Sequence, residues 1–360
     1  MDLPLVLYTF YLNIVINNQF FQEYKESSIL TSYNFARLAD FVYAEELTFE
    51  QYEILSKQNE VIVHNDHRIV YINPEILLKE NDIIFCNTHY VKYLFKALKS
   101  CNLKNLILIT HQSDISINKK LYDKKPDCIS KWFGINISYE AHNLIPIPIG
   151  LSNNYSPKNL FYKDFKKSNL DSIQKVNEIY VNFNINTNRK VREKLVKNLE
   201  DKSSFYIEKE NKDLNSYLTS LINFKYVICP EGNGIDTHRF WETIYAGSIP
   251  VSENKITLKA SDGLPVILLE SYDELSAEII FNYVLKENSF DVKKLTVEYW
   301  INLMKNYTIT SSEQFDYLES KSITKRNIVN YKFRIYSYSY YKKIKYYFLK
   351  LKKLSKVIKK

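Results

Sequence analysis

The chain has 360 residues, of which 45% are hydrophobic and 15% aromatic, a composition too apolar for an intrinsically disordered protein. With 6 glycines and 9 prolines it is neither collagen-like nor of low complexity. The net charge is +8, but residues 321–360 hold 14 of the 49 Lys and Arg and no acid, so the preceding chain carries 35 basic against 41 acidic residues. This distribution is not that of a nucleic-acid-binding protein, and the length favours two domains.

The first half of the chain alternates short apolar runs with helix-like stretches. Helical spacing predicts helices at Phe49–Lys57 and Val91–Lys99. β-Branched and aromatic runs predict strands at Leu5–Phe10, Phe41–Tyr43, Val61–His64, Ile69–Ile72, Asp82–Cys86, Leu106–Thr110 and Leu144–Ile149.

A polar stretch over residues 153–177, rich in Lys, Asn, Ser and Asp, interrupts this alternation, which then resumes. Strands are predicted at Ile179–Phe183, Phe205–Ile207, Tyr226–Cys229, Ile249–Val251 and Val266–Leu269. Helices are predicted at Arg189–Leu199, Leu214–Leu221, Thr237–Tyr245, Asp273–Glu287 and Thr296–Lys305. Strands alternating with helices of this length indicate an α/β protein with mainly parallel sheets, and the break indicates two such domains facing each other across a cleft.

The cysteines and the N-terminus bear on the compartment. The four cysteines are widely spaced, and Cys86, Cys128 and Cys229 sit in apolar contexts, so we expect buried free thiols in a reducing compartment rather than a zinc site. The apolar N-terminus has an acid, Asp2, where a signal peptide needs basic residues, and it is too short to span a bilayer. We therefore expect a cytoplasmic protein.

The most informative stretch runs from Cys229 to Val251 and reads CPEGNGIDTHRFWETIYAGSIPV. Three of the six glycines, Gly232, Gly234 and Gly247, fall within it. A strand that ends in a glycine loop and leads into a helix N-terminus favours phosphate binding, through free N–H groups and the helix dipole. In this interpretation Asp236 or Thr237 caps the helix and Gly247 takes the left-handed position after its end.

Two charged side chains lie on the helix that follows the loop. Arg239 and Glu242 are three residues apart and share one helix face. Arg239 could hold a phosphate through paired hydrogen bonds, and Glu242 could accept hydrogen bonds from sugar or ribose hydroxyls. The alternative is a surface ion pair between the two, with glycines that only form a turn.

The spacing Pro-x-Gly-x-Gly-x-Asp-x-x-Arg-x-x-Glu, followed by Ala-Gly-Ser-Ile-Pro-Val, resembles the signature of exostosin-like and ribitol xylosyltransferase-like glycosyltransferases. The resemblance is specific over about 25 residues and loose elsewhere. It implies the GT-B fold, with two Rossmann-like domains and a nucleoside-diphosphate sugar held mainly by the second. Donor-binding residues would be Gly232, Asn233, Gly234, Asp236, Thr237, Arg239 and Glu242.

Two further segments follow the order expected from this resemblance. Residues 178–192 look like the first strand–loop–helix of the donor domain, in which Asn184 and either Arg189 or Arg192 would face the diphosphate. A capped basic helix would have the same sequence pattern. The Pro-Ile-Gly-Leu element at Pro148–Leu151 resembles the end of the N-terminal domain. The predicted organisation is an acceptor-side domain at 1–152, a linker at 153–177, a donor domain at 178–308, and C-terminal helices with a basic tail at 309–360.

The resemblance implies a general base from the N-terminal domain. The apolar run 106–109 leads into Thr110, His111, Gln112, Ser113 and Asp114. Asp114 or His111 could act as the base, or Asp114 could orient His111. Asp114 could instead cap a turn, and Asn87-Thr88-His89 is a weaker candidate. We expect inverting transfer, with a retaining mechanism as the alternative because both occur on this fold. We expect no obligatory metal and no cofactor beyond the donor sugar. His238 is either a diphosphate contact or an exposed ring.

Residues 331–360 predict a basic amphipathic helix suited to an anionic membrane surface, with a solvated tail or packing against the N-terminal domain as alternatives. The expected partners are a nucleotide sugar and a glycan or lipid-linked acceptor in surface polysaccharide synthesis, with no nucleic acid. A non-catalytic nucleotide-sugar or glycan binder is the alternative function. A Rossmann-type dehydrogenase is disfavoured because Thr237 stands where the third glycine of its motif would be.

Overall fold

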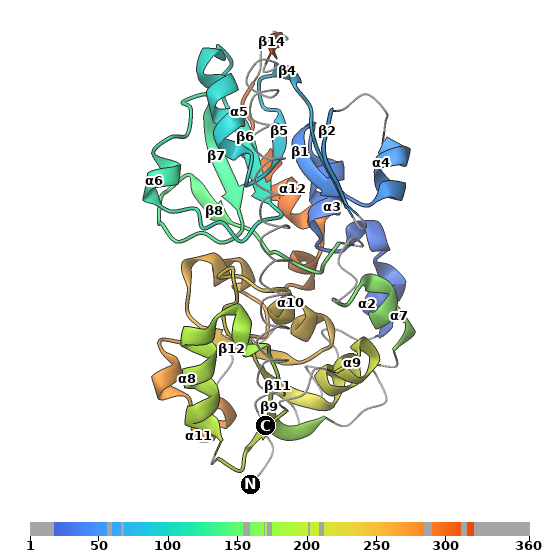
Figure 1. The fold of residues 1–360 in the computed structure, drawn as a ribbon, viewed down its shortest axis with the longest axis vertical. Helices are drawn as coiled ribbons and strands as arrows, with labels where there is room; N and C mark the ends of the chain where they lie inside the picture. The colour runs from blue at the N-terminus through green and yellow to red at the C-terminus, as the bar shows by residue number, and fades with distance from the viewer. Residues whose placement is uncertain are drawn as a thin grey trace, which may run out of the picture.

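The computed structural model describes most of the chain and contains two parallel-type sheets, one above the other in Figure 1. The described residues are 18–55, 60–65, 68–153, 159–168, 170, 175–200, 202–208, 212–283, 290–310 and 315–319. The predicted strand Leu5–Phe10 and the predicted amphipathic helix at 331–360 lie outside them. Within the described part, no helix is both long and apolar enough to cross a membrane.

The N-terminal sheet has seven strands in the order β2-β3-β1-β5-β6-β7-β8. Strands β1, β5, β6, β7 and β8 are parallel, whereas β2 and β3 form an antiparallel edge. The strands are β1 (Phe41–Leu47), β2 (Glu60–Asn65), β3 (Arg68–Ile72), β5 (Ile83–Asn87), β6 (Leu106–His111), β7 (Ile129–Gly134) and β8 (Leu144–Pro146). Every residue of β5 and β6 is buried, as the central strands of a parallel sheet require.

The second sheet has five parallel strands in the order β10-β9-β11-β12-β13. They are β9 (Val176–Val181), β10 (Phe205–Ile207), β11 (Phe224–Ile228), β12 (Ile249–Glu253) and β13 (Ile267–Leu269). The chain adds β10 on one side of β9 and β11 on the other, so the strand order reverses between β9 and β11. In open α/β sheets a crevice forms at such a reversal, at the carboxyl ends of the strands.

The helices connect and cover these strands (Figure 1). They are α2 (Asn18–Glu23), α3 (Ser32–Leu38), α4 (Phe49–Leu55), α5 (Val91–Ala97), α6 (Lys119–Tyr122), α7 (Tyr162–Lys167), α8 (Arg189–Leu199), α9 (Leu214–Asn223), α10 (His238–Tyr245), α11 (Ala277–Phe281) and α12 (Val297–Lys305). Helix α7 and the start of β9 fall within the predicted linker at 153–177.

The alternation of strands and helices predicted an α/β protein with mainly parallel sheets, and this is confirmed. Each predicted strand that falls in the described part is present, and the predicted helix Arg189–Leu199 matches α8 at both ends. Strand β7 was not predicted, because Ser130 and Lys131 interrupt its apolar run. The short antiparallel pair of β4 (Glu75–Lys79) and β14 (Phe315–Glu319) was also missed.

Among the predicted elements whose bounds differ from the structure, two have a clear physical reason. The helix predicted at Asp273–Glu287 starts later than expected: a 3-10 turn at Tyr272–Glu274 is followed by α11, which begins only after Ser276. Residues 284–287 of this prediction lie outside the described residues. The Ser276 hydroxyl accepts from Ile279 N and caps the new helix, so the chain breaks at that point. The strand predicted at Leu144–Ile149 ends at Pro146, because the nearby prolines lack the N–H donors that a sheet ladder needs.

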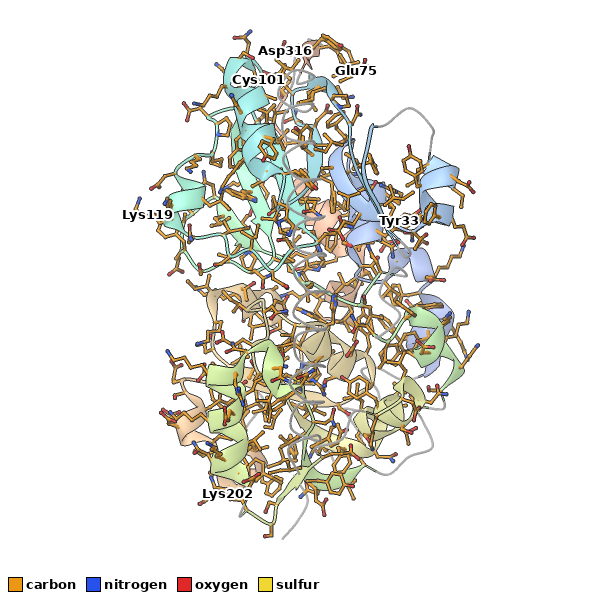
Figure 2. All side chains as sticks on the ribbon, in the orientation of Figure 1. Tyr33, Glu75, Cys101, Lys119, Lys202 and Asp316 are labelled. Atoms are coloured by element: carbon orange, nitrogen blue, oxygen red, sulfur yellow. The ribbon has the colours of Figure 1, made fainter. Side chains whose placement is uncertain are left out.

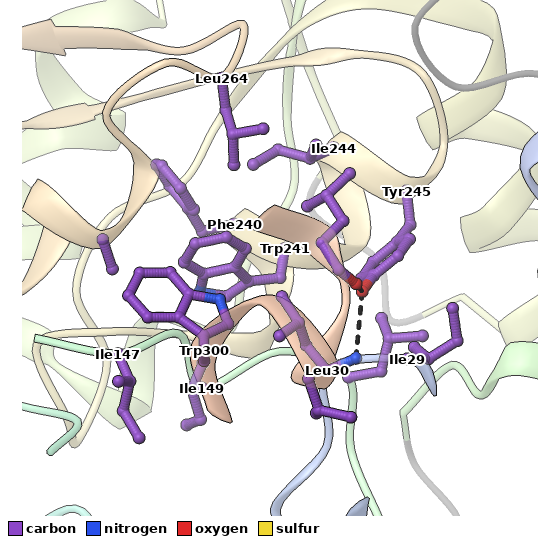
Figure 3. Packing of buried hydrophobic residues seen from close by; sticks show 14 of the residues in the cluster. Ile29, Leu30, Ile147, Ile149, Phe240, Trp241, Ile244, Tyr245, Leu264 and Trp300 are labelled. Atoms are coloured by element: carbon purple, nitrogen blue, oxygen red, sulfur yellow. Dashed lines mark hydrogen bonds between the residues drawn. The ribbon is translucent and has the colours of Figure 1, made fainter. Parts of the chain in front are cut away.

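The two sheets share a buried apolar core rather than meeting across an entirely open cleft. One cluster includes Phe85 and Ile109 of the N-terminal sheet together with Val227 of the second sheet. Helix α10 lies at its centre, where Trp241 packs among Ile147, Ile149 and Trp300 (Figure 3). The Tyr245 hydroxyl accepts a hydrogen bond from Leu30 N at 3.2 Å, which joins the two halves directly (Figure 3).

The C-terminal described segment returns to the N-terminal half. Helix α12 contacts α3, and β14 pairs with β4 at the upper end of the molecule in Figure 1. Asn105 Nδ2 donates to Tyr307 O at 3.0 Å, and Asn81 Nδ2 donates to Ile309 O at 2.8 Å. The chain therefore crosses between the halves a second time after the five-stranded sheet is complete.

Candidate functional site

Two loops meet at the point where the strand order of the second sheet reverses. The loop 182–188 follows β9, and the loop 229–237 follows β11. Because β9 and β11 are parallel neighbours, both loops emerge at the same edge of the sheet. This is the part of an open α/β sheet that most often holds a ligand.

Arg192 ties these two loops together. Its side chain donates from Nη1 to Asn184 O at 2.8 Å in the first loop, and from Nε to Glu231 O at 2.9 Å and Nη2 to Pro230 O at 3.1 Å in the second. Nη1 also donates to the Thr187 hydroxyl. Among the described residues, four of its five N–H groups therefore have acceptors, and one on Nη2 has none.

The structure distinguishes the two arginines that the sequence left open. Arg189 lies on the surface, where it forms an ion pair with Glu193 at 3.1 Å. Arg192 is buried, and burial together with the nearby charge of Arg239 lowers its pKa to about 10, so the guanidinium stays charged at neutral pH. Only Arg192 faces the loops.

Arg239, in the first turn of α10, carries the second positive charge. Its guanidinium carbon lies 4.8 Å from the centre of the Tyr217 ring. Its Nη1 is fully shielded from solvent and has no hydrogen-bond partner in the described part of the chain. No carboxylate of that part forms an ion pair with it, and Glu242 is among those that do not. A guanidinium desolvated in this way costs free energy unless a ligand supplies acceptors.

Glu242 is held by two groups of the protein. The Tyr217 hydroxyl donates to its Oε2 at 2.9 Å, and Leu160 N lies 3.4 Å from its Oε1. Tyr217 thus contacts both predicted donor-site residues of α10, one through its ring and one through its hydroxyl. Tyr217 was not predicted from the sequence, because nothing in the predicted helix Leu214–Leu221 distinguishes a binding-site tyrosine from one that packs in the core.

The two loop glycines make room for protein side chains. A Cβ on Gly234 would lie 2.9 Å from Nδ2 and Oδ1 of Asn136, and one on Gly232 would lie 3.2 Å from Arg192 Nη2. Neither glycine has the positive φ that only glycine adopts easily, so close approach explains them and backbone conformation does not. Gly247 does have a φ of 68°, which confirms its predicted place after the end of α10.

Asp236 is part of the contact between the halves. Its Oδ2 accepts from Ile149 N at 2.8 Å, its Oδ1 accepts from Trp241 Nε1 at 2.9 Å, and its own N–H donates to Asn136 Oδ1 at 2.8 Å. Burial raises the pKa of this carboxyl to about 7. Thr237 is the N-cap residue of α10, one of the two residues predicted for that position, but its side chain forms no capping hydrogen bond within the described part of the chain. The Asp236 carboxylate accepts from Ile149 and Trp241 instead.

Three further residues considered for donor binding are Asn184, Asn233 and His238. The two asparagines lie on the loop surfaces, and His238 lies against the N-terminal half. Asn184 and Asn233 are exposed, and the Asn184 side chain accepts from Asn186 N at 2.9 Å. His238 turns towards the other half, with Nδ1 2.8 Å from Gly150 O, and so is neither a free exposed ring nor part of the loop pair.

His111 is buried, and both of its ring nitrogens have backbone partners. Nδ1 accepts from Gln112 N at 2.8 Å, and Nε2 lies 3.3 Å from Pro148 O, to which it donates in this tautomer. Burial lowers its pKa to about 3, so the ring is neutral. The expected pairing of His111 with Asp114 is not made, and His111 has no nitrogen left for a substrate proton.

Asp114 is exposed in the loop after β6. The preceding Ser113 O accepts from Asn136 Nδ2 at 2.9 Å, and Asn136 Oδ1 in turn accepts from Asp236 N. A single side chain, Asn136, therefore connects the Asp114 loop to the glycine loop of the other half. Asn136 has a φ of 55°, a conformation that asparagine adopts more readily than most residues.

A buried polar cluster lies beside this loop, at the carboxyl ends of β1 and β5. Its residues Gln112 and Asn87 belong to the two candidate segments named from the sequence, whereas Glu46 was missed. Gln112 exchanges two hydrogen bonds with the backbone of Glu46, at 2.8 and 3.0 Å. Asn87 Nδ2 lies 3.3 Å from Glu46 Oε1. The available signal was a polar residue directly after, or at the end of, a fully apolar strand.

Within the described part of the chain, no three His, Cys, Asp or Glu side chains are grouped so that they could hold a metal ion. A scan against protein-family models finds no matching family, and a search of curated proteins finds no relative.

Proposed function

We propose that this protein is a GT-B glycosyltransferase that moves a sugar from a nucleoside-diphosphate sugar to a hydroxyl of a glycan acceptor. The second sheet would hold the donor over the loops that follow β9 and β11. The N-terminal sheet would supply the acceptor side. The return of α12 and β14 to the N-terminal half supports this arrangement, because it fastens the two halves at a second point.

The observation that carries the proposal is the shielded, unpartnered Nη1 of Arg239 beside the buried Arg192. Two like charges close together repel each other, and within the described part of the chain no carboxylate pairs with either. Against the effect of burial, the neighbouring Tyr217, Cys229 and Glu242 raise the pKa of Arg239 and keep it charged, but none of them accepts a hydrogen bond from Nη1. A diphosphate would supply that acceptor and a negative charge between the two arginines. As the sugar leaves, the same arginines would stabilise the charge that develops on the diphosphate.

The base in this proposal is Asp114, since both ring nitrogens of His111 are occupied by backbone partners and a pKa of about 3 makes that ring a weak base. The exposed carboxylate would accept the proton of the acceptor hydroxyl as its oxygen attacks the anomeric carbon of the donor sugar. The bond from that carbon to the diphosphate would break at the same time, with inversion. Through Asn136, the Asp114 loop is held against the loop proposed to bind the donor.

Glu242 contributes indirectly in this scheme. Its carboxylate holds Tyr217, whose ring lies over the Arg239 guanidinium, so it positions the cation rather than contacting the ribose. The proposed setting is the cytoplasmic side of a membrane, in surface polysaccharide synthesis, with residues 331–360 as the contact to anionic lipid. Both depend on the glycosyltransferase assignment.

Binding of a nucleoside diphosphate tests the assignment directly. We expect uridine, guanosine or cytidine diphosphate to bind the wild-type protein, and Arg239→Ala to weaken that binding about 10- to 100-fold, the value of one or two charge-assisted hydrogen bonds. Arg189→Ala is the matched control, because that arginine is exposed and paired with Glu193. Equal affinities of wild type and Arg239→Ala in titration calorimetry would overturn the proposal.

Release of nucleotide separates an enzyme from a binding protein. We expect the wild-type protein to release nucleoside diphosphate slowly from its donor in the absence of acceptor. Asp114→Asn should keep donor affinity but lose transfer to an added glycan. A protein that binds the donor and never releases nucleotide would be the non-catalytic alternative.

A further inference from the structure

A pocket lies at the end of the N-terminal half that is remote from the two loops of the candidate site. Its volume is about 810 Å³, and it is bounded by α5, by the following 3-10 turn Leu98–Ser100 and by residues 123–128. Two cysteines, Cys101 and Cys128, are among the residues that line it. Figure 2 shows Cys101 beside Asp316 at one end of the molecule, opposite Lys202 at the other.

The two thiols are neighbours, although 26 residues separate them in the chain. Cys128 Sγ and the backbone N–H of Cys101 both approach Leu98 O, at 3.8 and 3.1 Å. Both cysteines are free: Cys101 is half-buried, whereas Cys128 is 7% exposed. One thiol is therefore open to the pocket and the other lies behind it.

The surroundings of the two thiols shift their pKa values in opposite directions. Hydrogen bonding from the Cys128 thiol and from Leu103 N–H lowers the pKa of Cys101, against the opposite effects of burial and of the neighbouring Asp316 carboxylate. The same contact and burial raise the pKa of Cys128. A more acidic, accessible thiol backed by a second thiol is the arrangement found where cysteines undergo reversible oxidation.

The pocket also carries an excess of positive charge. Lys92, Lys96, Lys99, Lys124 and Lys125 line it, against Asp123 and Asp127. Asp123 is already paired with Lys119 at 2.9 Å. The other two cysteines have no comparable access, since Cys86 is 0% and Cys229 2% exposed. Asp316 adds a third carboxylate beside Cys101, so five lysines face three carboxylates around this thiol. The remaining positive charge favours an anionic reagent at Cys101.

We propose that Cys101 and Cys128 form a thiol–disulfide exchange site that accepts an anionic low-molecular-weight disulfide of the glutathione type. The Cys101 thiolate attacks one sulfur of the disulfide, and one glutathione thiolate leaves. The Cys128 thiol, after losing its proton to solvent, attacks Cys101 Sγ in the resulting mixed disulfide. The second glutathione leaves, a Cys101–Cys128 disulfide remains, and the two electrons lost by the protein reduce the glutathione disulfide to two thiols.

The test is the reaction of the folded full-length protein with glutathione disulfide, followed by thiol counting after denaturation and by peptide mass mapping. We expect the number of free thiols to fall from 4 to 2, with one peptide pair joined through Cys101 and Cys128. Cys128→Ser should stop at a glutathione adduct on Cys101. Cys101→Ser should keep all of its remaining thiols.

A charge test separates the pocket from general thiol reactivity. Lys96→Ala/Lys99→Ala should slow the reaction with glutathione disulfide severalfold at low ionic strength, yet leave the rate with neutral 2-hydroxyethyl disulfide unchanged. Lys305→Ala, on α12 outside the pocket, is the control. A wild-type protein that keeps all four thiols, that stops at a mixed disulfide, or that loses Cys86 or Cys229 instead would overturn the proposal.

Discussion

At Asp236, burial and hydrogen bonding act on one carboxyl in opposite directions. Burial favours the protonated form, whereas the N–H groups of Ile149 and Trp241 favour the charged form. Burial prevails, and the pKa rises to about 7. Between the unfolded value of about 4 and this folded value, the folded protein holds a proton that the unfolded chain has lost.

The consequence is a pH dependence of stability with a defined sign. The contribution of Asp236 is complete below about pH 4 and is lost as the pH rises through about 7, with a slope of about 1.4 kcal/mol per pH unit in between. Asp236→Asn cannot titrate, so the difference in unfolding free energy between wild type and variant should change with this slope. Urea denaturation from about pH 5 to pH 8 measures it, and parallel curves for the two proteins would contradict the prediction.

Residue types and spacing pointed to Arg239 and Arg192, because guanidinium groups near a loop after a strand are recognisable from sequence. They did not reveal the partners of these residues. Tyr217 and Asn136 lie on elements distant in sequence, and only tertiary contact brings them to Arg239 and Gly234. His111 failed as a predicted base for the same reason, since its neighbours Gln112 N and Pro148 O occupy both ring nitrogens.

At the scale of elements, the periods of the apolar residues located most helices and strands. The errors lie where a single residue, a capping serine or a proline, interrupts an element that the spacing of the apolar residues predicts. Ser276 starts a helix inside a stretch that looked continuous, and Pro146 ends a strand early. Strand β4 shows alternate burial, but its sequence EILLK places three apolar residues in a row, so the alternation is not visible in the residue types.

Gly150 lies in the segment that leads from the N-terminal sheet to the second half, and its substitution tests how tightly the backbone is packed there. Gly150 has a φ of 64°, and a Cβ there would lie 2.1 Å from Leu30 O. Gly263 has a comparable φ of 81°. Gly263→Ala should cost about 1–2 kcal/mol, the penalty of a left-handed conformation, and Gly150→Ala roughly twice as much because backbone must also move.

Thermal or chemical unfolding of the two glycine variants measures the comparison. Because both carry the same substitution at similar φ, the difference between them isolates the overlap with Leu30. Equal losses would mean that the contact between Gly150 and Leu30 relaxes without cost.

For the whole molecule, the contact between the halves depends on a fit between Gly234 and Asn136. Gly234→Ala should be destabilising because its Cβ would collide with the Asn136 amide at 2.9 Å. Asn136→Gly keeps the positive φ but loses hydrogen bonds to Ser113 and Asp236. In the double variant the collision is gone, so its loss of stability should be about 1 kcal/mol or more below the sum of the single losses.

Asn105→Gly is the matched control for this cycle. Asn105 has a φ of 56° but lies before β6, at the opposite end of the sheet. Combined with Gly234→Ala, it should give additive losses in the unfolding free energy. Additivity in the Asn136 cycle as well would show that the two halves do not meet through these residues.

The sequence by itself determined the alternation of strands and helices, the clustering of glycines around a strand–loop–helix unit, and the candidates Arg192 and Arg239. These depend on local periodicity and residue type, which the chain carries without its fold. Only the tertiary structure decided that Gly234 accommodates Asn136, that Asp236 joins the two halves, and that the shielded Nη1 of Arg239 has no acceptor among the described residues. Desolvation and close contact depend on which distant segments meet, and no local pattern records that.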